Sequence, residues 1–279
     1  MATLGEILKS ARQKLSASNI ESASLDATLI LSFLTNYSKV SLLIHDDDEV
    51  SDDLKDRYFS LIDKRASGYP TAYILGYKEF WGLKLNVNES TLIPRPDTET
   101  LVEAALNAKV KGKVLDLGTG SGAIILALKS EYKDDIEAFA SDMSEDALFV
   151  ARENAKSLNL DVEFIHSDWF LNIPKEKFSL IVSNPPYIRD DDEHLNKTSL
   201  PFEPITALTS GSDGGDDIRI ICKNAKDYLK EGAMLMVEHG YDQGLLISNI
   251  FKENGYRDVC TLKDLGGNDR VTIGCFCTK

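Results

Sequence analysis

Long hydrophobic runs are absent from this chain. No apolar stretch reaches the roughly 20 residues that a membrane-spanning helix needs. The N-terminus also lacks the basic region followed by an apolar run that marks a secretion signal. We therefore expect a cytoplasmic protein that does not associate with a membrane.

Cysteine is scarce, and its spacing is not that of a metal or redox motif. The chain has four cysteines and no C-x-x-C pair. Cys275 and Cys277 are two residues apart, on the same face of a predicted strand. We interpret the four cysteines as small buried hydrophobic residues, and the sequence predicts no metal site.

Positive charge is also in short supply. The 279 residues include 31 basic and 45 acidic side chains, which gives a net charge of −14. Proteins that bind duplex nucleic acid strongly usually do so through Lys and Arg paired to phosphates. The charge therefore argues against direct nucleic-acid contact, whereas it is compatible with a cationic small ligand.

Residues 1 to about 68 have helical periodicity. Two runs place apolar side chains on or near one stripe, and their members are Leu25, Thr28, Leu29, Ile30, Phe33 and Leu34 in the first run and Leu54, Tyr58, Leu61 and Ile62 in the second. The acidic segment His45–Glu49 between them is compatible with a metal cluster, but a solvated loop near a helix N-terminus explains it better. We predict a small helical recognition domain over residues 1–70.

An aromatic, alternating segment follows the helices. Residues 71–90 are predicted to form a β-hairpin linker that turns near Trp81-Gly82. Pro94 and Pro96 exclude a helix in the residues that precede them. Asp97 or Thr98 is a candidate cap for the helix that follows. The remainder, residues 91–279, is predicted to be one larger domain.

Short apolar runs alternate with helical segments in this larger domain. Such alternation is typical of βαβ units and of a parallel sheet covered on both faces. The last two strand-like runs, Tyr256–Leu262 and Arg270–Cys277, are too close together for a helix between them, so this pair should be antiparallel. The other predicted strands are Val114–Leu117, Ile136–Ala140, Val162–Ile165, Leu180–Val182 and Ala233–Val237, and helices are predicted from Ser121, Ser144, Gly215 and Tyr241.

A glycine-rich loop follows the first of these strands. Its residues are Gly118, Thr119, Gly120, Ser121 and Gly122. Alternate glycines allow a tight turn and let a ligand approach the N-terminus of the next helix. The spacing differs from the dinucleotide pattern G-x-G-x-x-G, and no Lys-Ser/Thr follows as in a phosphate-binding P-loop. The loop predicts a cofactor site of another kind.

Carboxylates end the next two strands. Asp142 is placed to accept both hydroxyls of a ribose, although it is also a candidate helix cap. Asp168 is placed to bind an exocyclic amine. Trp169 beside it is predicted either to flank an adenine or to belong to the core.

The tetrapeptide Asn184-Pro185-Pro186-Tyr187 ends the fourth strand. Two prolines stop strand pairing because neither has a backbone N–H. The result is an amide side chain, rigid carbonyls and an aromatic ring at the carboxyl edge of the sheet, where ligands bind in open α/β folds. A plain turn is the alternative.

Together these motifs resemble those of the HemK/PrmC family of protein-(glutamine-N5) methyltransferases. The resemblance extends from about Arg65 to the end and is carried by Phe80-Trp-Gly-Leu, Ile93-Pro-Arg-Pro-Asp-Thr-Glu99, Ser167-Asp-Trp-Phe170, Ser183-Asn-Pro-Pro-Tyr-Ile188, Phe202-Glu-Pro-Ile-Thr-Ala-Leu208, Glu238-His-Gly240 and Asn268-Asp-Arg-Val271. It implies a seven-stranded, Rossmann-like class I methyltransferase fold with a mostly parallel sheet, an antiparallel last strand and a small N-terminal helical domain. It also implies S-adenosyl-L-methionine as donor and S-adenosyl-L-homocysteine as product.

The resemblance also implies roles for individual residues. Gly118, Thr119, Gly120, Ser121, Gly122, Asp142, Trp169 and Asn184 would contact the cofactor. Asn184, Pro185, Pro186 and Tyr187 would hold a glutamine side chain, with Asn184, Pro185 and Tyr187 at the reacting amide. The glutamine would be that of the Gly-Gly-Gln motif in peptide chain release factors, bound by a monomeric enzyme.

Several alternatives remain at this level. Two alternatives change the methyl acceptor, to a ribosomal protein or to an adenine or other base in DNA or RNA. A third alternative is that the chain is a non-catalytic cofactor-binding module. His239 is interpreted as structural rather than catalytic, and Arg95 either pairs with an acidic neighbour or helps form the pocket wall. The long segment 188–207 is predicted to be a lid or a substrate-contacting loop.

Overall fold

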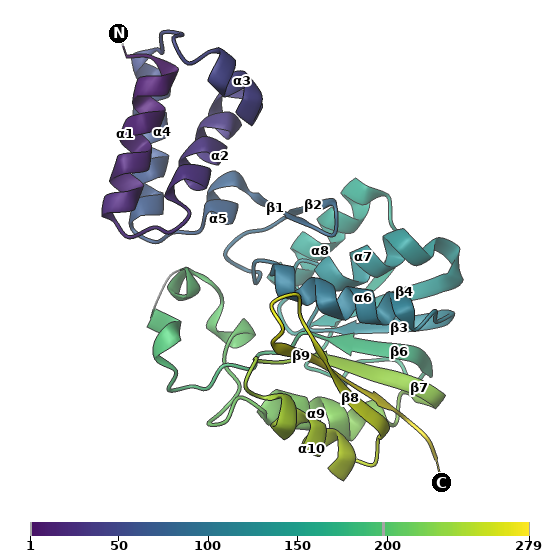
Figure 1. Cartoon of the computed structure of the whole chain (residues 1–279). Coiled ribbons are helices and arrows are strands. Elements are labelled where there is room, and N and C mark those ends of the chain that lie inside the picture. The colour runs from purple at the N-terminus through teal and green to yellow at the C-terminus, as the bar shows by residue number, and fades with distance from the viewer. Residues whose placement is uncertain (1, 197–198, 279) are drawn as a thin grey trace. The chain divides into compact units, whose positions relative to one another are not determined.

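The computed structural model describes residues 2–196 and 199–278. The chain divides into two compact units (Figure 1). One contains Met1–Tyr77 and Asn196–Phe202, and the other contains Lys78–Leu195 and Glu203–Lys279. Part of the segment predicted to be a lid, residues 197–198, lies outside the described residues. No described helix has the length and apolarity needed to cross a membrane.

The first unit is helical. Its helices are α1 (Leu4–Ala17), α2 (Ala23–Thr35), α3 (Lys39–Ile44), α4 (Asp52–Ala66) and α5 (Thr71–Leu75). A capping box starts α1, because the Thr3 hydroxyl accepts from the Glu6 N–H and the Glu6 carboxylate accepts from the Thr3 N–H. The rings of Tyr69 and Phe202, 5.4 Å apart between centroids, meet edge to face in this unit.

The predicted apolar stripe of α2 is wrong, whereas that of α4 is confirmed. In α4, Tyr58 and Ile62 are fully buried. In α2, Leu25 and Phe33 are 50% and 44% exposed, and the buried residues are Ala23, Asp26, Ala27, Ile30 and Leu31. Because α2 is apolar on several sides, the periodicity could not select its packed face. The small Ala23 and Ala27 and the paired Asp26 lie on that face.

Asp26 is a buried charge with a close partner. Its Oδ2 accepts from Arg65 Nε at 2.7 Å and from Ser22 Oγ at 2.6 Å. The Tyr58 hydroxyl donates to the Ala27 carbonyl at 2.9 Å nearby. These bonds tie α2 to α4 inside the helical unit, and they satisfy a charge that would otherwise be costly to bury.

The expected hairpin is present, but it begins at Tyr77, because the first part of the predicted segment, Thr71–Leu75, forms helix α5, which ends at Gly76 in the left-handed region. Strands β1 (Tyr77–Phe80) and β2 (Leu83–Asn86) form a two-stranded sheet. Trp81 (φ 50°) and Gly82 (φ 70°) both have positive φ at the turn, as a two-residue hairpin turn of type I′ requires. The Trp81 N–H donates to Glu99 at 3.0 Å, and its indole N–H donates to Glu131 at 2.9 Å, which holds this bulky residue in an unfavourable conformation.

A seven-stranded sheet forms the centre of this unit, in the order β5-β4-β3-β6-β7-β9-β8. Five strands are parallel, and β9 is antiparallel to both of its neighbours. The predicted class I fold is therefore confirmed. The strands are β3 (Gly112–Leu117), β4 (Ile136–Asp142), β5 (Val162–His166), β6 (Phe178–Ser183), β7 (Leu229–Glu238), β8 (Arg257–Lys263) and β9 (Asp269–Cys275).

Helices cover both faces of the sheet (Figure 1). On one face lie α6 (Glu99–Asn107), α7 (Ala123–Tyr132) and α8 (Glu145–Leu158), and on the other lie α9 (Asp216–Ala225) and α10 (Gly244–Glu253). Alternate strand residues therefore enter different cores. Val114 packs with α6 and α7, whereas Leu115 packs with α9 and α10.

Some local predictions need correction. β7 begins at Leu229 rather than Ala233, because Leu229 pairs with Phe178 beyond a bulge. Only Cys222 is fully buried, whereas Cys260 is exposed on the edge strand β8. Cys275 and Cys277 are half-buried, and their Sγ atoms lie 3.5 Å apart. β9 ends at Cys275, so Cys277 lies beyond the strand.

We predict that Arg65→Met destabilises the helical unit. It leaves the Asp26 carboxylate buried without its cationic partner, which costs about 3 kcal/mol. Hydrogen exchange of the α2 and α4 amides in the native protein measures this loss. Asp63→Asn, which breaks the exposed Lys14–Asp63 pair, is the control and should change stability by less than about 1 kcal/mol. Equal effects of the two variants would contradict the prediction.

Candidate active site

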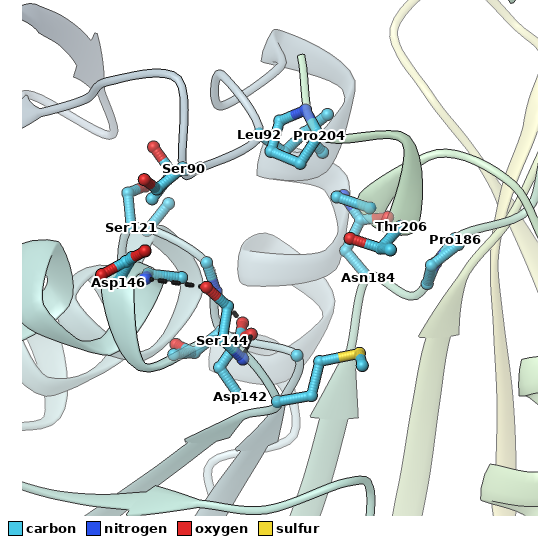
Figure 2. A pocket seen from close by; sticks show the side chains of 18 of the residues that line it. Ser90, Leu92, Ser121, Asp142, Ser144, Asp146, Asn184, Pro186, Pro204 and Thr206 are labelled. Carbon is cyan, nitrogen blue, oxygen red and sulfur yellow. Dashed lines mark hydrogen bonds between the residues drawn. The ribbon is translucent and has the colours of Figure 1, made fainter.

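A cavity of about 540 Å³ lies at the carboxyl edge of the sheet in the second unit. It is centred where β3 lies between β4 and β6, the point at which strand order reverses and where ligands bind in open α/β sheets. Figure 2 shows Ser121, Asp142, Ser144 and Asp146 on one side and Asn184, Pro186 and Thr206 on another. Its size is that of a site for a small molecule.

The glycine loop forms the floor of the cavity. Gly118, Gly120 and Gly122 all have positive φ, a conformation that side chains disfavour. The N–H groups of Gly118 and Thr119 both donate to the Ser141 carbonyl at 2.9 Å. Gly122 is the N-cap of α7 with φ 85°, and a Cβ there would also lie 2.9 Å from Leu126 Cδ1, so this position favours glycine.

Asp116, the last-but-one residue of β3, forms a hydrogen bond with this loop. It is fully buried, and its Oδ2 accepts from the Thr119 hydroxyl at 2.7 Å. Burial raises its pKa to about 7, against the opposing effect of the Thr119 hydrogen bond. The sequence places Asp116 before the glycines, but no role was predicted for it, because its burial follows only from the packing of the sheet.

Asp142 lies at the cavity and is not the cap of α8. Its Oδ2 accepts from the Gly120 N–H at 2.8 Å and its Oδ1 from the Ser144 N–H at 2.9 Å (Figure 2). The N-cap of α8 is Ser144, whose hydroxyl accepts from the Ala147 N–H. Burial raises the pKa of Asp142, while the backbone N–H groups oppose that shift. The carboxylate thus joins the glycine loop to the start of α8.

Trp169 belongs both to the cavity wall and to the edge of the core. It lines the cavity beside Asp168, and it also packs against the core on the α9 side of the sheet. Its indole N–H donates to Asp217 Oδ1 at 3.1 Å, and its φ is 44°. Asp217, in the first turn of α9, was not predicted as a site residue, since only the fold brings it 48 positions back to Trp169.

The charge of the cavity wall has one sign. Five carboxylate residues line it, and no Lys, Arg or His is among its described lining residues. The five are Glu89, Asp142, Asp146, Asp168 and Asp217. A phosphate-bearing cofactor would meet repulsion here, whereas a cation is attracted.

The tetrapeptide after β6 is not a plain turn. Asn184 and Pro186 line the cavity. The Tyr187 N–H donates to the Leu208 carbonyl at 3.2 Å, and Ile188 forms a bridge with Thr209. The Tyr187 hydroxyl donates to Glu238 Oε1 at 3.4 Å, and burial raises the pKa of Tyr187.

Asn184 presents an unused acceptor. Its Nδ2 donates to the Thr98 hydroxyl at 3.2 Å. Its Oδ1 is buried and has no hydrogen-bond partner within the described structure. A buried acceptor without a partner costs free energy, so Asn184, which lines the cavity, is a candidate to accept a hydrogen bond from a ligand.

His239 and Arg95 do not line this cavity. Nδ1 of the fully buried His239 donates to the Gly240 carbonyl, so its Nε2 accepts from the Thr272 hydroxyl, both at 2.9 Å. Burial lowers the pKa of His239, which favours this neutral form. Arg95 pairs with the buried Glu203 at 2.5 Å, and Glu203 also accepts from the Ile93 N–H. The structural interpretation of His239 and the pairing of Arg95 are confirmed.

The fold and the methyltransferase family model define this protein as a class I methyltransferase. The model, described as a methyltransferase small domain, matches residues 96–202, and a PrmC N-terminal domain model matches residues 6–76. A methyltransferase structure from Pyrococcus furiosus aligns with a TM-score of 0.53 at 20% identity, covering 80% of this chain and 99% of that one. The hMettl16 catalytic domain with a 3′UTR hairpin aligns with a TM-score of 0.56 at 15% identity, covering 81% and 82%.

Curated relatives narrow the class to one family. Proteins named release factor glutamine methyltransferase are 43% identical in Haemophilus influenzae (91% of this chain, 92% of the relative) and 44% identical in Shewanella oneidensis (97% and 95%). The one from Escherichia coli is 41% identical (96% and 97%). This chain belongs to the family of release factor glutamine methyltransferases.

We predict that Asp116→Asn stabilises the protein near pH 8. Folded Asp116 keeps its proton up to about pH 7, whereas the unfolded carboxyl ionises near 3.8. The folded state therefore binds more protons between these values, and stability falls as the pH rises through that window. Asparagine keeps an acceptor for Thr119 and removes the penalty, which is on the order of a few kcal/mol.

Urea unfolding at pH 5 and pH 8 measures the effect. The variant should gain stability relative to the wild type at both pH values, and the gain should be clearly larger at pH 8 than at pH 5, because pH 5 lies only a little above the unfolded pKa of 3.8. Asp134→Asn, at an exposed site, is the matched control and should show no such difference. A gain independent of pH would count against a buried ionisation at Asp116.

Proposed function

We propose that this protein transfers the methyl group of S-adenosyl-L-methionine to the side-chain amide nitrogen (N5) of the glutamine in the Gly-Gly-Gln motif of peptide chain release factors. The observation that carries the proposal is the buried, unpartnered Asn184 Oδ1 at the edge of an acidic cavity. An acceptor held there suits the N–H of a planar amide. The names of the relatives point to the same acceptor.

The cavity residues fit S-adenosyl-L-methionine. Its methyl group is activated by a sulfonium cation, which five carboxylates and no lining cation favour. All three of Asp142, Asp168 and Trp169 line the cavity, and we propose that they bind the ribose hydroxyls, the exocyclic amine and the face of the base, respectively. Gly118, Thr119, Gly120, Ser121 and Gly122 leave room for the close approach of the amino-acid part.

The reaction requires the protein to align the amide nitrogen with the methyl group, and it does not require a strong base. An amide nitrogen is a weak nucleophile because its lone pair is delocalised into the carbonyl. We propose that Asn184 Oδ1 and the Pro185 carbonyl each accept one N–H of the glutamine amide, which points its lone pair at the methyl group. Pro186 lines the cavity beside Asn184, whereas Tyr187 is not among the lining residues; we propose that its ring stacks on the flat amide of the bound glutamine. The glutamine nitrogen loses its proton after the methyl group has transferred, when it has become positive.

The acceptor is proposed to be a protein. The net charge of −14 and the acidic cavity do not favour a phosphate backbone. The helical unit and residues 188–207 are candidates for binding the partner. In that segment Pro204, Thr206 and Ala207 line the cavity, and Ile205 is exposed. The likeness to a hairpin-bound enzyme shows the shared fold alone and does not change this choice.

The direct test incubates the protein with isotopically labelled S-adenosyl-L-methionine and a release factor, followed by mass spectrometry of peptides. We expect the mass of one added methylene on the Gly-Gly-Gln glutamine. A release factor with Gly-Gly-Ala should stay unlabelled. Label on another residue type, or on a ribosomal protein or nucleic acid in place of the release factor, would overturn the proposal.

We predict that Asn184→Ala lowers turnover by about 100-fold or more, because it removes the side-chain oxygen proposed to accept an N–H of the reacting glutamine amide. Cofactor affinity, measured by calorimetry, should change by only a few-fold. Asn249→Ala, at an exposed position of α10, is the control for a general effect of removing an asparagine. Turnover of Asn184→Ala equal to that of the control would remove Asn184 from the reaction.

We predict that Asp142→Asn weakens cofactor binding by about tenfold or more, since hydrogen bonds to a charged acceptor contribute roughly 1.5–3 kcal/mol. Calorimetric titration with S-adenosyl-L-homocysteine measures the loss. Asp134→Asn provides a matched exposed control. Undiminished affinity would show that the carboxylate serves only the loop and α8.

A further inference from the structure

Trp169 is the one aromatic residue among the described residues that line the cavity. A planar base stacks well on an indole only where the ring offers its face rather than its edge. The proposed function, on which this inference rests, assigns the face of the base to this ring. Something in the protein must therefore set the plane of the ring.

The backbone of Trp169 is held in an uncommon conformation. Its φ is 44°, which a bulky residue rarely adopts. The Ser167 hydroxyl donates to the Trp169 carbonyl at 2.9 Å and accepts from the Asn172 N–H at 2.9 Å. These bonds fix the point where the side chain leaves the main chain, but they do not set its two side-chain torsions.

Contacts at two opposite edges of the ring set these torsions. On the pyrrole edge, the indole N–H donates to Asp217 Oδ1 at 3.1 Å. On the other edge, Cζ3 and Cη2 lie beside Gly118, 3.6 and 3.7 Å from the place that a Cβ there would occupy. Together with the attachment of the ring to the main chain, these contacts define one plane.

Asp217 is itself held in place. It lies in the first turn of α9, and its N–H donates to the hydroxyl of the buried Ser210 at 2.9 Å. The Ser210 N–H donates in turn to the Ile188 carbonyl at 2.9 Å. Because Ile188 directly follows the tetrapeptide, the oxygen that receives the indole N–H is tied to the segment that ends β6.

We propose that Asp217 is a positioning residue whose side-chain oxygen fixes the plane of the Trp169 ring for stacking on the base of the cofactor. Asp217 acts through Trp169 and does not touch the reacting atoms. The role needs an oxygen that accepts a hydrogen bond, and it does not need a negative charge.

NMR of the indole N–H groups tests the contact in the protein without ligand. The chain has two tryptophans, and each donates to one carboxylate: Trp169 to Asp217, and Trp81 to the exposed Glu131 at 2.9 Å. Trp81→Phe assigns the two signals. Asp217→Leu should move the Trp169 signal upfield, because its hydrogen bond is lost, whereas Asp217→Asn keeps an oxygen and should leave it near the wild-type position. Glu131→Leu is the matched control and should move the Trp81 signal alone.

Calorimetric titration with S-adenosyl-L-homocysteine measures the consequence for binding. Asp217→Leu and Asp217→Asn both remove the carboxylate charge, so the difference between them isolates the hydrogen bond. We expect Asp217→Leu to bind about fivefold more weakly than Asp217→Asn, the equivalent of about one hydrogen bond. Glu131→Leu should bind as the wild type does.

A double-mutant cycle separates positioning of the ring from direct contact with the cofactor. In a Trp169→Phe background, Asp217→Leu and Asp217→Asn should bind equally, because the N–H that Asp217 receives is gone. A difference that persists in this background would overturn the proposal, since Asp217 would then bind the cofactor itself. Equal affinities of the two variants with Trp169 present would overturn it as well.

The outcomes keep this proposal distinct from the proposed function. An unmoved Trp169 signal in Asp217→Leu contradicts the role of Asp217 alone. A wild type that binds S-adenosyl-L-homocysteine but does not methylate glutamine contradicts the proposed function and leaves the role of Asp217 standing. A wild type that does not bind S-adenosyl-L-homocysteine contradicts both.

Discussion

The pairing of β3 with β6 is the constraint on which the site depends. Leu117 and Ser183 are register partners at the carboxyl end of this pair, and the Ser183 hydroxyl donates to the Leu117 carbonyl at 2.7 Å. The next residues are Gly118 on one strand and Asn184 on the other. A glycine loop that turns toward α7 and a proline pair that ends β6 therefore open side by side. A shift of register by one residue would face every strand side chain to the opposite core.

Buried charge organises the space around this pair of strand ends. Asp116, Asp142 and Glu238 all have pKa values raised by burial, and each is held by hydrogen bonds to loop or helix-start residues. Asp116 and Asp142 hold the cofactor side, and Glu238 lies behind the acceptor side. Because these groups are costly to bury, their positions are informative: Asp142 lines the cavity, whereas Asp116 and Glu238 are fully buried and accept hydrogen bonds from Thr119 of the glycine loop and Tyr187 of the tetrapeptide.

The shared fold does not determine the class of methyl acceptor, whereas the side chains at the cavity reduce the number of acceptor classes that fit. Enzymes of this architecture include one solved with a 3′UTR hairpin, so the sheet order by itself does not separate protein from nucleic-acid acceptors. The wall of five carboxylates and the unpartnered Asn184 Oδ1 are features of this chain's own side chains. They support the proposed cationic donor and neutral amide acceptor, and the relatives' name includes a glutamine.

The sequence by itself determined the sheet with its antiparallel end, the hairpin, the glycine loop and the tetrapeptide. Each of these depends on neighbours along the chain: strand periodicity, turn residues, and prolines that lack an N–H. Only the tertiary structure decided which face of α2, a helix with apolar residues on several sides, is buried, that Cys260 is exposed, and that Arg95 pairs with Glu203. It also decided that Asp217 accepts a hydrogen bond from Trp169. The Thr98 hydroxyl likewise accepts from Asn184 and makes no capping bond to α6. These contacts join residues far apart in the chain, and their energies come from burial and from hydrogen-bond geometry, which local periodicity does not record.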